Sequence, residues 1–162
     1  MAWTSDMVVM TRYIINDVDD SAYTYTDSRI QQSIVIAANL VLTEIDFDNS
    51  YTIDINAVTI TPDPTSSSPK DIAFMNLVSL RAAVIVFSNE AKLASRQGIK
   101  IKDGPSEIDT FGRLGSALRM LDRAKKDFDK ARVDYIVGNA RVGQVILGPY
   151  TVEGISSGDG IE

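Results

Sequence analysis

The sequence predicts a mainly α-helical fold: a bundle of about four helices with two short β-hairpin-like connections and an extended C-terminal arm. Three observations support this prediction. Four long segments carry apolar residues at helical spacing, two short segments alternate like strands, and six of the last 25 residues are Gly. We expect one helical domain over residues 1–137, with a β-prone insertion at about 50–61 and a hairpin at 99–110. A Gly-rich arm over 138–162 follows it.

The first helix is expected to begin after a cap on Thr4 or Ser5 and to end at Ile15, where the acidic stretch 16–21 interrupts the pattern. Two alternative stripes fit the helical period. They are Val8, Thr11 and Ile15, or Met7, Met10 and Ile14.

The second helix is predicted to begin at Thr26, an N-cap residue, and to end near residues 46–50. Tyr25 before the cap and Ile30 within the helix fit a hydrophobic staple, and Asp27 suits the positive end of the helix dipole. Its apolar stripe is continuous: Ile30, Ile34, Ala37, Ala38, Val41, Leu42 and Ile45.

Residues 51–60 alternate and are rich in β-branched side chains, which favours either one strand or a hairpin that turns at Asn56. A Pro- and Ser-rich loop follows over 61–69. Ser68 is the expected N-cap of a third helix, with Pro69 at its first position and Asp71 completing a capping-box-like pattern. This helix is expected to reach about Gln97, and its apolar middle, residues 80–87, is predicted to be buried.

The segment 99–110 is predicted to be a miniature β-hairpin that turns at Asp103-Gly104-Pro105. A short turn between two long helices fixes them as antiparallel neighbours. The fourth helix is expected over about 111–137, with a narrow heptad seam and charged outer faces. The seam consists of Leu114, Ala117, Leu121, Ala124, Phe128, Ala131 and Tyr135.

The Gly-rich segment after residue 137 contains two short β-prone runs that cannot form a core of their own. A mobile tail is one interpretation. The other is an extended arm that binds another chain by strand addition. The candidate partner-binding residues of this arm are Val145, Ile146, Leu147, Tyr150 and Val152.

Composition lowers the expectation of enzymatic chemistry. The chain has no Cys and no His, so it lacks the thiolate nucleophile, the commonest general base and the commonest transition-metal ligand. The acidic turns 17–20 and 46–49 lack the Gly and the closing Glu of a calcium loop. We expect no catalytic residues, no metal site, no cofactor and, since no long uninterrupted apolar run occurs, no membrane span.

Charge is unevenly distributed over the chain. Residues 1–68 hold 2 basic and 10 acidic side chains, whereas residues 69–137 hold 13 basic and 9 acidic ones. A solvated surface explains this asymmetry, and so do identical subunits that meet through opposite charges. On the second interpretation the subunit-interface candidates are Lys100, Lys102, Asp103, Arg119, Arg123, Lys126 and Lys130.

Three places in the chain resemble the head–tail connector (adaptor, or head-completion) proteins of tailed bacteriophages. The first is residues 11–17 followed by 23–30, an opening helix, an acidic loop and the Thr26-Asp27 entry to a second helix. The second is the long apolar helix from Pro69 to Gln97. The third is the turn 99–110 into a last long helix. The β-prone segment 51–60 with its Pro-rich loop is longer than the compact helix connection expected of the family, and the Gly-rich segment after residue 137 has no motif that can be aligned with it.

The resemblance implies a structural virion protein of the phage neck, assembled in the bacterial cytoplasm. Its subunits would form a ring of about twelve that docks under the portal protein, continues the DNA channel and offers an attachment surface to downstream neck or tail proteins. DNA would pass through as cargo. The alternative is a nucleic-acid-binding ring such as a small packaging-terminase subunit, which requires a helix-turn-helix in a basic N-terminal region, whereas residues 1–68 carry a net charge of −8.

Overall fold

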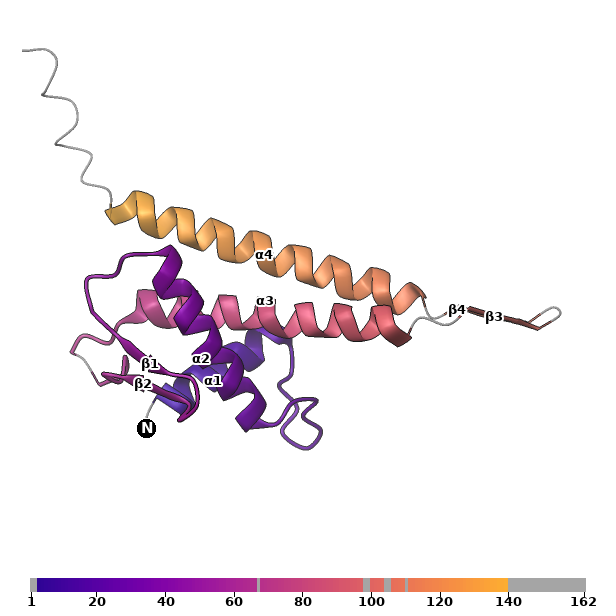
Figure 1. Ribbon diagram of the computed structural model, residues 1–162, viewed down its shortest axis with the longest axis horizontal. Helices are drawn as coiled ribbons and strands as arrows, with labels where there is room; N and C mark the ends of the chain where they lie inside the picture. Colours follow the sequence, from indigo (N-terminus) through magenta and orange to yellow (C-terminus); the bar gives the residue numbers. More distant parts are fainter. Residues whose placement is uncertain (1–2, 67, 98–99, 104–105, 110, 140–162) are drawn as a thin grey trace, which may run out of the picture.

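The computed structural model describes residues 3–66, 68–97, 100–103, 106–109 and 111–139 (Figure 1). Over these residues the chain is mainly helical with two antiparallel hairpins, which confirms the predicted fold class. The elements in chain order are α1 (Trp3–Ile15), α2 (Asp27–Glu44), β1 (Thr52–Asp54), β2 (Thr59–Thr61), α3 (Ile72–Gln97), β3 (Lys100–Asp103), β4 (Ser106–Asp109) and α4 (Phe111–Asn139).

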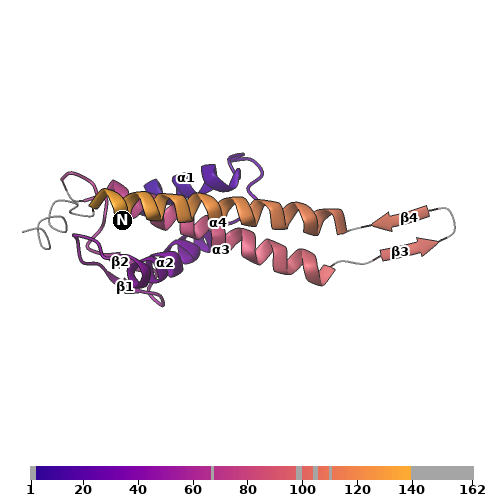
Figure 2. The same cartoon turned by 90° about the horizontal axis from the view of Figure 1, so that it is seen from above.

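Helix α3 is the centre of the fold, because α1, α2 and α4 all pack on it. Figures 1 and 2 show α3 and α4 as a long antiparallel pair, with α1 and α2 beside only the half of the pair that contains the start of α3. The paired strands β3 and β4 project beyond the other end of this pair (Figure 2). One end of the bundle therefore contains all four helices, whereas the other end consists of the α3–α4 pair and the β3–β4 hairpin.

The buried core follows the predicted stripes of the helices. Residues 82–84 and 86 of α3 are buried, as expected for the middle of this helix. The heptad seam of α4 faces α3, with Leu121, Ala124 and Phe128 buried. In α1 the stripe of Val8, Thr11 and Ile15 is buried, together with Met7, whereas Met10 and Ile14 lie at the edge of the core. The first of the two alternative stripes is therefore the core stripe.

An ion-pair cluster links the three longest helices. Glu44 at the end of α2 accepts a hydrogen bond of 2.7 Å from Arg81 of α3 and lies 3.5 Å from Arg132 of α4. Arg132 also lies 3.5 Å from Asp129, which is three residues earlier on the same helix. The guanidinium of Arg81 in turn covers the ring of Phe128 at 4.9 Å. These contacts lie where α2, α3 and α4 meet.

The β-prone segment forms a hairpin, so the second of the two alternatives is confirmed. Thr52 pairs with Thr61 and Asp54 with Thr59. The Asp54 carboxylate accepts hydrogen bonds of 2.9 Å from the backbone N–H groups of Asn56 and Ala57, which fixes the turn at the position expected. The second predicted hairpin is also present, and its strands pair from Lys100 opposite Asp109 to Asp103 opposite Ser106.

The start of α3 differs from the prediction. Asp71, not Ser68, caps this helix: its carboxylate accepts a hydrogen bond of 3.0 Å from the backbone N–H of Phe74. The helix therefore begins at Ile72 rather than Pro69. The second carboxylate oxygen of Asp71 accepts from the Tyr51 hydroxyl at 2.7 Å and from Asn49 at 2.9 Å. These partners come from the segment before β1, so they are long-range contacts that favour capping by Asp71.

Among the described helices, α3 is the one that is long and apolar enough to cross a membrane by length and composition. More than half of its most apolar stretch is buried inside the protein. Its contacts with α1, α2 and α4 account for that apolar character, because a helix at the centre of a bundle is apolar on nearly every face.

Candidate assembly surface

The connection between α1 and α2 is built around the buried guanidinium of Arg12. A left-handed residue, Asn16, ends α1: its N–H bonds to the Tyr13 carbonyl, and the next N–H, of Asp17, bonds to the Arg12 carbonyl at 2.9 Å. This Schellman-type ending turns the chain back on the helix. It brings the Asp17 carboxylate to 2.6 Å from Arg12, with both side chains buried.

The same guanidinium also binds the segment that leads into α2. Arg12 donates to the Tyr25 carbonyl at 2.9 Å and to the Asp27 carboxylate at 2.5 Å, and it stacks on the Tyr23 ring at 3.6 Å. Asp17 accepts the backbone N–H of Thr24 at 2.8 Å. Arg12 and Asp17 thus fix the loop 16–26 onto α1, and these residues form the first of the three places that carry the family resemblance.

Capping and burial attach the start of α2 to the rest of the bundle. The Thr26 hydroxyl accepts the Arg29 backbone N–H, which confirms the predicted N-cap. Tyr25 and Ile30, the predicted staple, are both buried. The Tyr25 hydroxyl donates to the Glu90 carboxylate of α3. Burial and this carboxylate raise the pKa of Tyr25, so the phenol stays protonated as a structural donor.

The Tyr51 hydroxyl is a similar hydrogen-bond donor at the other end of the bundle. Burial and hydrogen bonding to Asp71 raise the pKa of the Tyr51 hydroxyl. Burial raises the pKa of the Asp71 carboxyl, but hydrogen bonds from Asn49, Phe74 N–H and Tyr51 outweigh it, so that the net pKa lies below the ordinary value. The Tyr51 ring stacks on Phe74 with centroids 4.0 Å apart. Both phenols therefore act as hydrogen-bond donors that hold the fold.

An apolar groove runs along α1 with α3 as its floor, and α4 forms its other wall over two of its three hollows. We call it the α1–α4 groove. Three open hollows of about 400, 540 and 470 Å³ lie in a row along it. Adjacent hollows share lining residues, Val9 and Met10 between the first two and Ile14 and Leu80 between the last two. The side chains that line the groove also include Tyr13, Met75, Met120, Arg123 and Ala131.

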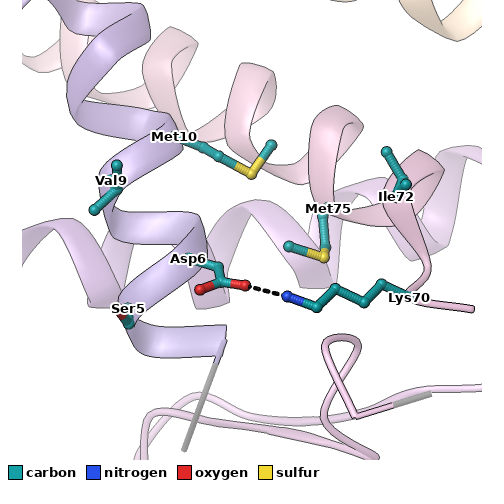
Figure 3. A pocket seen from close by; sticks show the side chains of 7 residues that line it. All are labelled: Ser5, Asp6, Val9, Met10, Lys70, Ile72 and Met75. Atoms are coloured by element: carbon teal, nitrogen blue, oxygen red, sulfur yellow. Dashed lines mark hydrogen bonds and ion pairs between the residues drawn. The ribbon is translucent and has the colours of Figure 1, made fainter. Parts of the chain in front are cut away.

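Figure 3 shows the end of this groove that lies at the start of α3. Met10 of α1 and Met75 of α3 extend into the space between the two helices. At the same end, Lys70, two residues before α3, forms an ion pair of 2.8 Å with Asp6 of α1. Methionine side chains are flexible and adapt to different apolar partners. This end is therefore suited to contact an apolar protein segment rather than a small polar ligand.

The predicted interface residues of α4 share one exposed face. Arg119, Arg123, Lys126 and Lys130 are spaced i, i+4, i+7 and i+11, and all four are exposed. We call them the α4 basic stripe. Arg123 is also part of the lining of the α1–α4 groove, so the stripe borders the groove. The same face continues beyond Lys130 with two exposed apolar residues, Val133 and Val137.

The other predicted site residues lie elsewhere. Lys100, Lys102 and Asp103 belong to β3, in the hairpin that projects from the bundle, and are separate from the groove (Figure 2). The arm residues lie outside the described residues. They are Val145, Ile146, Leu147, Tyr150 and Val152.

The groove and the buried role of Arg12 were not predicted from the sequence. One available signal was the exposed apolar pair Val9 and Tyr13, spaced i,i+4 on the face of α1 that the core stripe does not use. Within the described ranges, no group of three or more Asp or Glu side chains is arranged to hold a metal ion. Comparison of the chain with protein-family models, with curated proteins and with solved structures found no match.

Proposed function

We propose that this protein is a structural subunit of a tailed-phage neck: a ring-forming head–tail adaptor that docks under the portal. It continues the DNA channel and offers an attachment surface to the next neck or tail protein. The observation that carries the proposal is the shape of the α3–α4 pair. A long, stiff helical pair ends in a β-hairpin that projects beyond the bundle (Figure 2), as suits a subunit that reaches its neighbours.

The segments that resemble the adaptor family support this proposal because each coincides with a distinct structural device. The first, which includes Arg12 and Asp17, forms the buried joint between α1 and α2. The second is the central helix α3, and the third is the β3–β4 hairpin. The resemblance therefore follows the elements that define the fold and not a stretch of shared composition.

Charge provides a way for identical subunits to associate. The α4 basic stripe is exposed, whereas the first 68 residues are strongly acidic. Five of their exposed acidic side chains lie on loops and on the β1–β2 hairpin: Asp19, Asp20, Asp46, Asp48 and Asp54. A basic helix face on one subunit and acidic loops on the next are complementary, and such complementarity fixes register and speeds association. A heterologous contact of this kind generates a ring when its rotation closes.

The test is the mass of the assembly, measured by native mass spectrometry with the chain alone and with purified portal rings. The proposal expects a closed ring of about twelve chains, or a portal complex carrying that number, and a ring in electron micrographs. A chain that stays monomeric with the portal present, and that never enters particles, would contradict it.

Deletion of Asp103-Gly104-Pro105 tests the role of the projecting hairpin. The strands β3 and β4 that flank this turn project beyond the bundle (Figure 2), so far-UV circular dichroism should still report a helical protein. We expect ring formation to be abolished, because the turn sets how α4 is presented to the neighbouring subunit. Rings of normal size in this variant would show that the hairpin is only a linker.

The α4 basic stripe favours a second candidate function, a nucleic-acid-binding ring such as a small packaging-terminase subunit. Four exposed cations over the twelve residues 119–130 follow one helix face. Binding through such a stripe depends strongly on salt, because each neutralised phosphate releases counterions. A mobility-shift titration from low to physiological salt separates the functions: tight, steeply salt-dependent binding of duplex DNA supports the second, and weak binding supports the adaptor.

A further inference from the structure

The α1–α4 groove leaves large apolar side chains accessible on the surface of the described chain. Val9 and Met120 are each 51% exposed, and Tyr13 is 73% exposed. These residues lie on two walls of one groove and not singly over the surface. Contiguous exposed apolar surface of this kind is a mark of an interaction site.

The path of α4 brings the C-terminal end of the described chain to one end of this groove. Ala131 lines the same hollow as Asn76 and Leu80, whereas Met120 lines the next hollow with Phe87. Helix α4 therefore runs antiparallel to α3, and its C-terminal end lies at the same end of the bundle as the start of α3, as Figure 1 shows. The Asp6–Lys70 end of the groove is at the start of α3 as well.

The chain beyond α4 is long enough to reach the α1–α4 groove and to run along its length. Residues 140–144 can span at most about 17 Å, which exceeds the 8–10 Å that separate packed helix axes. The groove extends over the part of α3 from Ile72 to Phe87, about 22 Å at the helical rise of 1.5 Å per residue. An extended segment from Val145 to Val152 covers about 23 Å at the rise of a strand.

The chemistry of this segment also matches the groove. It contains the main apolar run beyond α4, and its Gly148-Pro149 pair favours an extended chain over a helix. The methionines of the groove can adapt to its branched side chains and to Tyr150. Glu153 follows the segment and would reach the end of the groove where Arg123 lies.

We propose that, in the unassembled subunit, the segment Val145–Val152 lies in the α1–α4 groove of its own chain. It runs from the Asp6–Lys70 end toward Arg123. Docking shields the apolar run of the arm and the exposed wall residues of α1 and α4 from solvent. The inference goes beyond the proposed function and does not depend on it. If rings form, an arm that binds a neighbour must first leave this groove.

Paired cysteines in the full chain test the proposal, because the natural sequence contains no Cys and each variant can form only one intramolecular disulfide. The test variant carries Val9→Cys and Leu147→Cys. The control carries Val133→Cys and Leu147→Cys. Val133 is 50% exposed, matching Val9 at 51%, but it lies on the outer face of α4 and closer in sequence to the arm. If the arm met both positions only at random, the control variant would therefore form its disulfide faster than the Val9 variant.

The rate of intramolecular disulfide formation is measured at high dilution under mild oxidation, by peptide mass mapping. Docking raises the effective concentration of the paired thiols, so the Val9 variant should oxidise at least about tenfold faster than the control. Equal rates would overturn the proposal. Disulfide-linked dimers from the Val9 variant would also overturn it, because they would assign the groove to the arm of a second copy.

A third variant checks that the apolar run is what docks. Ile146→Asp and Tyr150→Asp are added to the Val9/Leu147 cysteine pair, outside the described bundle, so the fold of residues 3–139 is unaffected by them. Their charges would have to be buried in an apolar groove, which is costly. The oxidation rate should fall to that of the Val133 control. A rate that stays at the original value would overturn the proposal.

Discussion

Arg12 Nη1 lies 2.6 Å from the Asp17 carboxylate, and both side chains are almost completely buried. The two residues are only five positions apart, yet their contact holds the whole connection between α1 and α2. Tyr23 and Thr24 fold over the pair from the far side of the loop, through a ring contact and a backbone hydrogen bond. The joint is therefore a small polar core beside the main apolar one.

Replacing Arg12 by Met should destabilise the protein by about 3–5 kcal/mol, because it leaves the Asp17 carboxylate buried without its cation. The measurement is the free energy of unfolding from urea titrations followed by circular dichroism. Arg119→Met is the matched control: Arg119 is exposed on α4, and its loss should change stability by no more than about 0.5 kcal/mol. A loss below about 1 kcal/mol for Arg12→Met would contradict a structural role for the buried pair.

The Asp71 carboxylate should make stability depend on pH in the acid range. Its pKa is lowered in the folded protein relative to the ordinary value of 3.8, so the unfolded chain takes up a proton first as pH falls. The stabilisation is complete above the ordinary pKa and is lost as pH falls through the lowered one. Urea titrations between pH 7 and pH 3 should show the advantage of the natural chain over Asp71→Asn shrinking toward acid pH.

Tyr51→Phe is the control for this assignment. The Tyr51 hydroxyl donates to Asp71 at 2.7 Å and contributes to the low pKa of that carboxyl. Phe keeps the ring that stacks on Phe74 and removes only the donor. The acid dependence of stability should become weaker in this variant, and an unchanged dependence would assign it to other carboxyl groups.

Phe128 should be the most sensitive position of the α4 seam. Its ring is 1% exposed and lies under the Arg81 guanidinium. Phe128→Ala should cost about 3–5 kcal/mol, since it removes a large buried ring and leaves a cavity between α3 and α4. Leu118→Ala on the same helix is the control, because Leu118 is 45% exposed. Thermal unfolding of both variants compares them, and similar melting temperatures would mean that α4 is not firmly packed on α3.

Much of this architecture could be predicted from local sequence. Thr26 before a continuous apolar stripe is sufficient to predict the start of α2, because capping and amphipathic spacing depend only on neighbouring residues. The heptad seam of α4 and the alternating segment that forms β3 and β4 are local signals in the same sense, and the structure has the buried seam and the paired strands.

The features that were missed depend on contacts between distant segments. Ser68-Pro69 and Asp71 are both acceptable helix starts, and Tyr51 and Asn49 favour Asp71 from about twenty residues away. The apolar spacing of α1 fits two stripes, and the packing of α2 and α3 determines which one is buried. The α1–α4 groove exists only because both helices lie on α3, so no single segment could reveal it.

Reversing one charge of the α4 basic stripe should weaken assembly if identical subunits meet through opposite charges. Lys126→Glu would place a carboxylate among acidic loops of the neighbouring subunit and introduce repulsion. The concentration at which rings form should rise about tenfold or more, as measured by mass photometry over a dilution series. Raising the salt concentration should weaken the natural assembly and narrow the difference between the two proteins, because screening affects attraction and repulsion alike.

Lys125→Glu is the control, because it makes the same charge change on the adjacent residue of the same helix. Lys125 is also exposed, but it points about 100° away from Lys126 around α4 and lies outside the basic stripe. It should leave the ring-forming concentration almost unchanged. Equal weakening by both substitutions would mean that overall charge, and not the stripe, governs association. No effect from either would place the subunit contact on another face of the bundle.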